Sequence, residues 1–478
     1  MTSCDRRLVL VFVILFGFFA RAATYKAPFF DHHGWRQSDT ASIARNFHRE
    51  RFNLFYPQID QRGARDEGYV ETGLELFAFL VAAFSLPFGF HHETGRVLSA
   101  LLFVGSGVLT WSFVRRRYGE RHGLAAAFLH AFGFPLLLYI ERAFMNEALL
   151  IFLSLACLTS SQRYLDAGRR RDLACLLTAS TVIGAIKLPY LIVWFPVVGL
   201  YLERHGRRAA WRPDLWAMAA LNLTGAAAWY LHARRLGART GLSFGLADKL
   251  FDPAIVFTPA FPVWVFDRMF VDVLGPVSFL AAALGFSLCL QARRWCELLG
   301  LTGFGLYLVI VAWGNFHHDY YQLAIVPVAS SAGAAGVVWL GDRLGGATAS
   351  RQNTMLAALL ALAATSTFVR SVGAHSWYEV RPESVETCRL ARELSAPGEL
   401  VVFIGEDNPQ MMFCLDRRGW LISAEDATPA RIEAVWNEGA RLAVVPAVFE
   451  GEETRRLLAE RAELLLEQPS TVVYRFLP

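Results

Sequence analysis

Long apolar runs separated by short basic segments dominate the chain. Runs such as LVLVFVILFGFFA, LLIFLSLACL and MLAALLALAATSTFV come close to spanning length once their flanks are counted, because a helix needs about 20 apolar residues to cross a bilayer. The segments between the runs are rich in arginine, as in RRRYGERH at 115–122. This pattern predicts a polytopic α-helical membrane protein with about eleven spanning helices plus interfacial or re-entrant ones.

The arginine-rich connections also predict the orientation. Cytoplasmic connections carry an excess of Lys and Arg. The basic connections all fall on the cytoplasmic side only if the apolar run 74–90 does not cross the membrane completely. We therefore expect a re-entrant or interfacial helix there. Residues 25–73 then form a long outer loop, and the carboxyl tail also lies outside. The connections expected inside are 115–122, 163–171, 203–212, 292–294 and 342–351.

The first apolar run has two interpretations. Residues 6–23 resemble a signal peptide that ends in an Ala-x-Ala cleavage pattern. Arg21 lies inside that pattern and argues against cleavage. We therefore expect an uncleaved first helix, with Arg6 and Arg7 holding the amino terminus in the cytoplasm.

The residue pattern changes at about residue 371. Strand-like segments such as ELVVFIG and RLAVVPA alternate with helix-like segments such as TPARIEAVWNEGA. We therefore expect a transmembrane domain over 1–370 and a small extracytoplasmic α/β domain over 371–478. GEDNP is a turn signal, and without a GxGxxG or P-loop motif we assign no nucleotide site there.

Composition supports the membrane assignment and narrows the chemistry. The chain is 54% hydrophobic and 18% charged, with a mean hydropathy of +0.34. Its net charge of +4 comes from arginines that punctuate the apolar runs, so nucleic acid is not expected as a partner. The cysteines show no metal spacing and no disulfide framework. A bond between Cys388 and Cys414 is an alternative if the tail lies outside the cytoplasm.

Polar clusters fall on the expected outer side. The first is DHHGWRQ at 31–37, the second runs from FYPQID to Glu71, the third is ERAFMNE at 141–147, and the fourth is NFHHDYYQ at 315–322. Lys187 lies between two apolar runs on the same side. Ionisable groups at membrane depth are costly and usually line a cavity or a pathway, so we expect a single site at the outer membrane surface.

Carboxylates beside cations suit transfer to an alcohol or amine with a phosphate leaving group. A carboxylate accepts the proton of the nucleophile, and a guanidinium or ammonium group stabilises the departing phosphate. A lipid-linked donor explains why such a site lies in the membrane.

Several of these residues also have structural interpretations. Trp35, Tyr320 and Tyr321 suit an interfacial aromatic belt. Arg142 and Glu147 could form an ion pair at helix ends. Adjacent histidines could bind a divalent metal, but their spacing alone does not indicate one.

The polar motifs resemble a known family. HGWRQSDTASIARNF, followed by YPQID and Glu71, is similar to the first outer loop of a bacterial branch of the membrane glycosyltransferases with the C-type fold. That group contains the protein O-mannosyltransferases and the lipid A aminoarabinose transferases. The spacing of Arg142 and Glu147, Lys187 before a proline, and HHDYYQL are also similar, so the resemblance covers about residues 8–370.

The resemblance implies an inverting transfer of a sugar from a polyprenyl-phosphate or diphosphate carrier to a glycan, lipid or protein acceptor outside the cytoplasmic membrane. In the two named families an Asp-Glu pair precedes the IAR-like helix, whereas this chain has Arg36 and Gln37. We therefore expect Asp31 to be the base, with Asp60 and Glu71 in reserve. The expected substrate contacts are His33, Trp35, Arg36, Gln37, Thr40, Arg142, Glu147, Lys187, His317, His318, Tyr320 and Tyr321.

Other functions remain as alternatives. A secondary transporter or a flippase for a polar lipid would usually show inverted repeats or charges at the membrane midplane, and the sequence shows neither. A ligase or polymerase of surface polysaccharide would differ mainly in the size of the transferred unit. A non-catalytic scaffold for the tail would leave the first-loop cluster unexplained.

Overall fold

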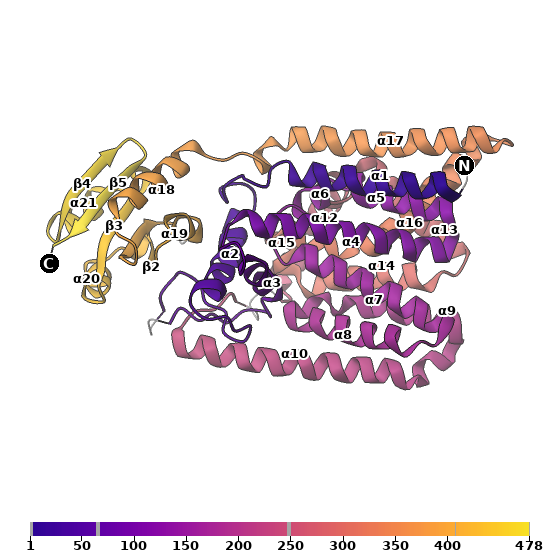
Figure 1. Cartoon of the computed structure of the whole chain (residues 1–478), viewed down its shortest axis with the longest axis horizontal. Helices are drawn as coiled ribbons and strands as arrows, with labels where there is room; N and C mark the ends of the chain where they lie inside the picture. Colours follow the sequence, from indigo (N-terminus) through magenta and orange to yellow (C-terminus); the bar gives the residue numbers. More distant parts are fainter. Residues whose placement is uncertain (1–2, 64–66, 246–249, 407, 478) are drawn as a thin grey trace. The chain divides into compact units, whose positions relative to one another are not determined.

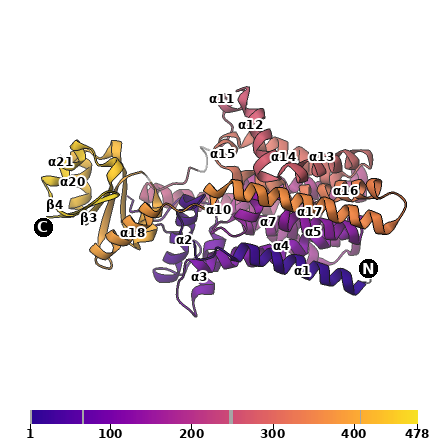
Figure 2. The ribbon, with the colours of Figure 1, turned by 90° about the horizontal axis from the view of Figure 1, so that it is seen from above.

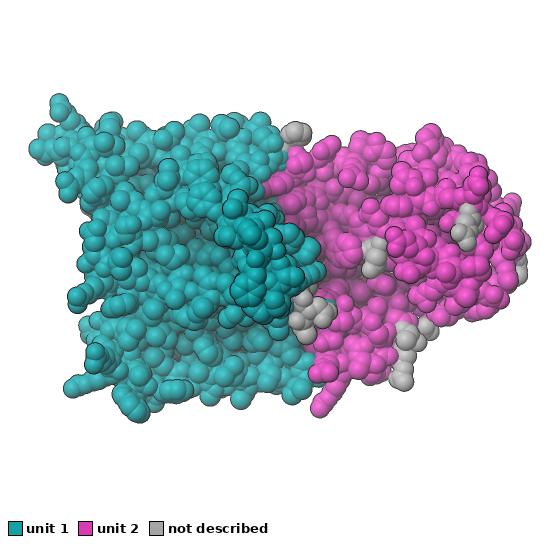
Figure 3. All heavy atoms as spheres, turned by 180° about the vertical axis from the view of Figure 1, so that it is seen from behind, with its two compact units in different colours: residues 1–25, 96–232, 245–374 teal, residues 26–95, 233–244, 375–478 magenta. Residues whose placement is uncertain are grey.

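The structure is a computed structural model that describes residues 3–63, 67–245, 250–406 and 408–477. Residues 64–66 of the expected outer loop lie outside these ranges. The chain divides into two compact units (Figure 3). Unit 1 comprises 1–25, 96–232 and 245–374, and unit 2 comprises 26–95, 233–244 and 375–478. Unit 2 thus combines the first-loop region with the carboxyl-terminal segment.

Unit 1 is a helical bundle in which most long helices lie side by side (Figures 1 and 2). Short 3-10 or π-helical turns interrupt it at η1 (Leu188–Val193), η2 (Gly206–Trp211), η3 (Met269–Val273) and η4 (Asp319–Ile325). Its helices are α1 (Ser3–Ala22), α4 (Glu93–Tyr118), α5 (Glu120–Phe132), α6 (Pro135–Ile140), α7 (Glu147–Ala167), α8 (Arg170–Ile186), α9 (Trp194–His205), most of α10 (Pro213–Thr240), α11 (Pro253–Val256), α12 (Ala260–Arg268), α13 (Pro276–Gln291), α14 (Trp295–Ile310), α15 (Ala312–His317), α16 (Val326–Gly345) and α17 (Ala349–Gly373).

Four helical stretches among the described residues are long and apolar enough to cross a membrane: α4, α7, η4 with α16, and α17. The bent pair formed by α12–η3 and α13 would make a fifth span. Several other segments counted in the expected eleven are shorter, with 13 residues in α5, 12 in α9 and 16 in α14. The expected number of spans therefore stays a prediction. The run 74–90 contains α3 (Leu76–Ser85), whose 10 residues are too few to cross as a single helix.

Small residues allow α13 and α16 to approach closely. A Cβ atom on Gly285 would lie 1.7 Å from the backbone oxygen of Ala332, and one on Gly336 would lie 2.1 Å from that of Ala281. Interfaces of small residues are how helices pack in a membrane, where apolar side chains gain little by leaving lipid. Larger residues at either glycine would force the two helices apart.

Buried ion pairs hold α1 in the bundle. The guanidinium of Arg21 donates to Oε2 of Glu141 through Nε at 3.0 Å and Nη2 at 2.7 Å. His130 lies 3.1 Å from the other oxygen of Glu141, and the guanidinium also lies over the ring of Phe103. The side chain of Arg21 is fully buried. That the first helix stays uncleaved remains a prediction.

A second set of ion pairs joins several of the helix connections that were expected on the cytoplasmic side. Arg117, at the end of α4, pairs with Glu203 at 2.9 Å and with Glu297 at 2.7 Å. Arg121 pairs with Asp342 at 2.8 Å. The connections after α4, α9 and α13 therefore meet at one end of unit 1.

Unit 2 contains a five-stranded sheet together with the first-loop helices α2 (Gly34–Arg49) and α3. The sheet has the order β2-β1-β3-β5-β4; β2, β1 and β3 are parallel, and β5 is antiparallel to both β3 and β4. The other elements are α18 (Pro382–Leu394), β1 (Leu400–Gly405), α19 (Pro409–Leu415), β2 (Gly419–Ser423), η6 (Ala424–Asp426), α20 (Pro429–Asn437), β3 (Ala440–Pro446), η7 (Ala447–Phe449), α21 (Glu452–Ala459), β4 (Ala462–Gln468) and β5 (Thr471–Phe476), with η5 (His375–Trp377) at the start.

Apolar clusters cover both faces of this sheet. Successive residues of a strand point to opposite faces, so neighbouring residues belong to different clusters. Val402 and Ile404 of β1 belong to one apolar cluster, with Ile432 of α20 and Leu458 of α21. Phe403 belongs to the opposite cluster, with residues of α18 and α19. The expected small α/β fold at the carboxyl end is therefore confirmed.

A disulfide bond joins α18 to α19. Cys388 and Cys414 are bonded, with their Cα atoms 6.0 Å apart. This is the pair that the sequence left as an alternative. The bond fixes α19 to α18 at a point two residues before Asp416, the residue that caps α19.

Candidate active site

The residues of the first loop are arranged around the start of α2. His33 immediately precedes the helix in the left-handed conformation, with φ 56°, which is uncommon for a residue other than glycine. Nearly all of α2 is buried, including polar Gln37, Asp39 and Arg45. Small residues such as Ala41 and Ala44 let the helix pack closely, and several of its polar side chains bond to groups outside α2.

The expected base, Asp31, is oriented by α2. Nε2 of Gln37 donates to Oδ1 of Asp31 at 2.7 Å and to the backbone oxygen of His32 at 3.0 Å. Asp31 is only 6% exposed. The amide of Gln37 therefore fixes the direction of this carboxylate relative to the helix.

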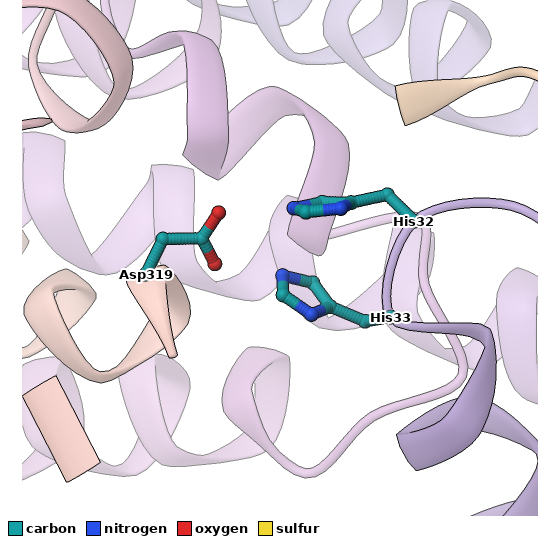
Figure 4. A group of neighbouring side chains, drawn as sticks. All are labelled: His32, His33 and Asp319. Atoms are coloured by element: carbon teal, nitrogen blue, oxygen red, sulfur yellow. The ribbon is translucent and has the colours of Figure 1, made fainter. Parts of the chain in front are cut away.

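Two adjacent histidines lie beside Asp31. The ring centroids of His32 and His33 are 3.7 Å apart (Figure 4), and His32 stacks on Trp377 with centroids at 5.4 Å. His32 and His33 thus lie side by side, and each can offer one ring nitrogen to a divalent cation.

Arg36 is paired with a carboxylate that the sequence did not single out. Nη2 of Arg36 donates to Oε1 of Glu75 at 3.0 Å, and the hydroxyl of Thr72 donates to the same oxygen at 2.9 Å. Glu75 is fully buried immediately before α3. Its sequence signal was an isolated acid in the apolar run LELFAFL. Arg36 and Gln37 thus each bind a carboxylate from outside α2.

Asp39 is a second residue that the expected site omitted. Burial raises the pKa of Asp39 to about 7, and this shift is reinforced by Glu75 and Asp60 and opposed by Arg36 and a hydrogen bond from Trp35. A carboxyl group with a pKa near neutrality can both hold and release a proton under working conditions. The sequence showed Asp39 in the motif but could not show its burial.

The two reserve carboxylates have different surroundings. Asp60 is buried and ion-paired with Arg45, and it also accepts from Nδ2 of Asn46 at 3.3 Å. Both oxygens of Asp60 are therefore engaged by α2. Glu71 is half-buried, and its backbone bonds to Leu242 and Phe244 beyond the end of α10.

Two expected contact residues of the first loop bond within α2. The hydroxyl of Thr40 donates to the backbone oxygen of Arg36 at 2.8 Å, which is a common helical use of threonine. Trp35 is 49% exposed, and its indole N–H bonds to Asp39. The exposed ring of Trp35 remains available to a ligand or to lipid.

In unit 1, Lys187 is surrounded by aromatic rings. Its ammonium group lies 3.1 Å from Oε1 of Glu147. It also lies 3.4 Å from the ring centroid of Tyr321, 5.0 Å from that of Tyr320 and 5.3 Å from that of Tyr190. Cation–π contacts of this kind stabilise a partly desolvated ammonium group. Tyr190 was not among the expected site residues, although it is close to Lys187 in the sequence KLPY.

The remaining predicted residues of unit 1 lie near short helices. Arg142 is 3% exposed, with its guanidinium over the ring of Tyr139 at 4.3 Å. His318 stacks on Tyr320 with centroids at 5.3 Å, whereas His317 packs against Trp313 at 4.3 Å. The segments α6, η3 and η4 contact one another, and both η1 and η4 contact α7. The third and fourth polar clusters are therefore gathered within unit 1.

The ion pair of Glu147 differs from the alternative considered for the sequence. Among the described residues, Glu147 pairs with Lys187 and not with Arg142. The interpretation of Arg142 and Glu147 as an ion pair is therefore wrong. Arg142 lies in the turn between α6 and α7, whereas Glu147 is the first residue of α7.

Comparisons with known proteins identify the fold. Residues 75–232 match the dolichyl-phosphate-mannose-protein mannosyltransferase family. ArnT from Cupriavidus metallidurans bound to undecaprenyl phosphate superposes with a TM-score of 0.65 at 12% identity, covering 99% of this chain and 98% of that one. The chain has the C-type glycosyltransferase fold.

Two other solved structures also have this fold. ArnT in the apo state gives a TM-score of 0.62 at 14% identity, with 99% of this chain and 98% of that chain covered. The apo oligosaccharyltransferase from Archaeoglobus fulgidus gives 0.58 at 13% identity, with 99% and 74% covered. No curated protein sequence matches the chain significantly. The C-type fold is therefore shared over nearly the whole chain, although few residues are identical.

Proposed function

We propose that this protein is an integral-membrane glycosyltransferase. It moves a sugar from a polyprenyl-phosphate or diphosphate carrier to an envelope acceptor on the outer face of the cytoplasmic membrane. The observation that carries the proposal is the C-type fold over 99% of the chain, shared with an ArnT structure that holds undecaprenyl phosphate. The arrangement of polar residues supplies the chemistry that such a reaction needs.

Asp31 is the proposed base. As the acceptor hydroxyl or amine attacks the anomeric carbon, its proton passes to a carboxylate oxygen of Asp31, and the bond from that carbon to the phosphate oxygen breaks. A single displacement of this kind inverts the anomeric configuration. Gln37 supports the role because its amide holds Asp31 in one orientation, and a fixed base acts with little reorganisation.

Lys187 is the proposed partner of the leaving phosphate. Lysine acts on phosphate as a compact point charge, and in a low-dielectric setting that attraction is stronger than in water. The rings of Tyr320 and Tyr321 shield the ammonium group from solvent. Glu147 keeps Lys187 in place before the donor binds. Arg36 and Arg142 are proposed to assist through bidentate contacts with phosphate or sugar.

Two observations support an outer placement of the loop and tail. The disulfide between Cys388 and Cys414 lies in unit 2, and disulfides persist in oxidising compartments. The arginine-rich connections that carry Arg117 and Arg121 meet at one end of unit 1, as expected for the cytoplasmic side. Glu147 begins α7 and lies about 30 Å along that helix from its other end, which leads into the connection 163–171 that was expected inside.

The acceptor is proposed to be a glycan, a lipid or a protein of the cell envelope. The test combines envelope glycan mass spectrometry, with and without the protein, and transfer by detergent-solubilised protein from a synthetic short-chain prenyl-phosphate sugar. We expect one glycan mass to disappear in cells, and the purified protein to release prenyl phosphate as the sugar is transferred.

The same assay separates the alternatives. A transporter or flippase would move the prenyl-linked sugar in vesicles without breaking the bond between sugar and phosphate. Release of prenyl phosphate with a single sugar added supports the proposed transferase, and addition of a whole oligosaccharide would identify a ligase or polymerase. Intact donor in every purified assay, together with vesicle transport, would contradict the proposal.

A further inference from the structure

The first loop and the carboxyl-terminal domain share an ionic contact inside unit 2. Arg45 and Arg49 are one turn apart on α2, and both reach Asp416 at the end of α19. The Nη1 atoms of Arg45 and Arg49 each lie 2.8 Å from Oδ1 of Asp416. The helices α2 and α19 also pack against each other. Asp416 is therefore a single carboxylate that receives two cations from α2.

This contact continues to the returning part of the loop. The other terminal nitrogen of Arg45 bonds to Asp60, and Nδ2 of Asn46 bonds to the backbone oxygen of Gln58 at 2.8 Å. The guanidinium of Arg45 also lies over the ring of Phe413, 4.7 Å from its centroid. One buried arginine thus joins the tail, α2 and the segment around Asp60.

The backbone of the loop also bonds to the edge of the sheet. The N–H of Gly419 donates to the oxygen of Asp60 at 3.2 Å, and the N–H of Arg62 donates to the oxygen of Gly419 at 2.7 Å. Gly419 begins β2, which is an edge strand of the sheet. Exposed strand edges readily pair with another segment, and here the first loop supplies it.

A third contact lies on the other side of Asp31. Nε2 of Gln410 in α19 donates to the backbone oxygen of Phe29 at 2.8 Å. The rings of Phe29 and Phe413 have centroids 5.3 Å apart. The stretch that contains Asp31 and Gln37 is therefore held from both directions by the same short helix.

The conformation of Asp416 suits this role. Its φ of 55° and ψ of 43° are left-handed, a conformation that Asp and Asn tolerate better than most residues. The disulfide at Cys414 ties the same end of α19 to α18. The disulfide and the backbone conformation thus hold the carboxylate of Asp416 in a fixed position at the end of α19.

We propose that Asp416 is a positioning residue for the transfer reaction: through Arg45 and Arg49, it holds α2 so that Asp31 stays in its working orientation. This inference rests on the proposed function. The carboxyl-terminal domain is then a structural part of the active site, although Asp416 itself touches no reacting atom.

The test is Asp416→Asn in the full-length protein. Asparagine keeps the size and tolerates the left-handed conformation, so the change removes the charge and leaves the backbone in place. We expect kcat to fall about 10-fold, since a small displacement of a catalytic group is costly, while the donor KM stays close to that of the parent. Hydrogen exchange of the amides in 34–49 should become faster.

The matched control is Glu386→Gln, which removes an exposed ion pair with Arg389 within α18. It should leave both kcat and the exchange of 34–49 unchanged. If Asp416→Asn fails to fold, Arg49→Gln provides the second variant, because Arg49 is half exposed and Arg45 would still hold Asp416. Arg49→Gln should then show the same fall in kcat and the same faster exchange of 34–49, both smaller than in Asp416→Asn.

Parental kcat in Asp416→Asn would overturn the inference, with or without faster exchange. A loss of kcat without any change in exchange would also overturn it, because Asp416 would then act by another route. The exchange measurement needs no substrate. An absence of transfer by the parent protein would count against the proposed function, while faster exchange in Asp416→Asn would still establish the ionic link to α2.

Discussion

Lys187 and Glu147 form an ion pair in unit 1, with Nζ of the lysine 3.1 Å from Oε1 of the glutamate. Glu147 is the first residue of α7 and Lys187 directly follows α8. The two residues come from the ends of packed helices, and each limits the motion of the other. A cation held in this way is ready for an anion without ordering a flexible side chain first.

Lys187→Ala should raise the apparent donor KM and also slow transfer. Loss of one charge-assisted contact costs on the order of 1.5–3 kcal/mol, or about 10- to 150-fold in kcat/KM. Steady-state transfer with a synthetic prenyl-phosphate sugar measures both constants. Arg234→Ala, at an exposed position of α10, is the control and should change neither. Parental constants in Lys187→Ala would place the phosphate elsewhere.

Asp31→Asn should lower the rate of transfer by about 100-fold or more, the usual effect of removing an acid–base group. The amide keeps the size of the side chain and can still bond to Gln37. Single-turnover transfer by the purified variant measures the chemical step. If Asp31→Asn is nearly as active as the parent, the same measurement on Asp39→Asn, Asp60→Asn and Glu71→Gln should identify the base.

Asp39 should make stability depend on pH. Its pKa is raised from 3.8 to about 7 in the folded protein, so the folded state binds more protons than the unfolded state between these values. Stability contributed by the protonated group is present below about pH 4 and is lost as the pH rises towards 7. Thermal unfolding of the parent and Asp39→Asn at pH 5 and pH 8 measures this effect.

The stability of Asp39→Asn relative to the parent should increase between these two pH values by on the order of 2–3 kcal/mol. Asp426→Asn, on the exposed part of unit 2, should show a difference that hardly depends on pH. A difference for Asp39→Asn that stays constant from pH 5 to pH 8 would contradict the raised pKa.

Arg21→Met should destabilise the protein strongly, because it leaves the buried carboxylate of Glu141 without its main cation. Breaking a buried ion pair from one side costs about 3–5 kcal/mol. Thermal unfolding in detergent should show a lower melting temperature, and Arg21→Met combined with Glu141→Gln should recover part of the loss. A double variant no more stable than Arg21→Met would argue against this coupling.

The topology makes a separate prediction. Single cysteines introduced into a cysteine-free background should react with an impermeant maleimide in intact cells when placed at Glu399 and should not react at Arg169. Glu399 precedes β1, and Arg169 lies between α7 and α8. Labelling at Arg169 and protection at Glu399 would reverse the orientation and exclude chemistry on the outer face.

Much of the architecture could be predicted from the sequence, because hydrophobic periodicity and the basic segments between apolar runs are local signals. Apolar runs indicated the helices, and the alternation in ELVVFIG and RLAVVPA indicated strands that became β1 and β3. The number of spans could not be settled in this way. Prolines such as Pro135 and Pro189 break apolar runs into short helices, and composition alone does not show whether two short helices cross as one.

The site was predictable as a set of residues but not as a set of pairs. Asp31 and Gln37 are close in sequence, and their contact is local. Glu75 lies 39 residues from Arg36, and Asp416 lies 367 residues from Arg49. Such partners depend on tertiary packing, which a single sequence does not reveal.

The burial of Arg21 has a consequence for how the protein is made. Its partner Glu141 follows 120 residues later in the chain, so the first helix enters the membrane well before that carboxylate is synthesised. Until then, a guanidinium near the end of an apolar helix favours the water boundary. The buried ion pair of α1 can therefore form only after α5 and α6 have been made, so the earliest helix of the bundle reaches its final position later than its place in the chain implies.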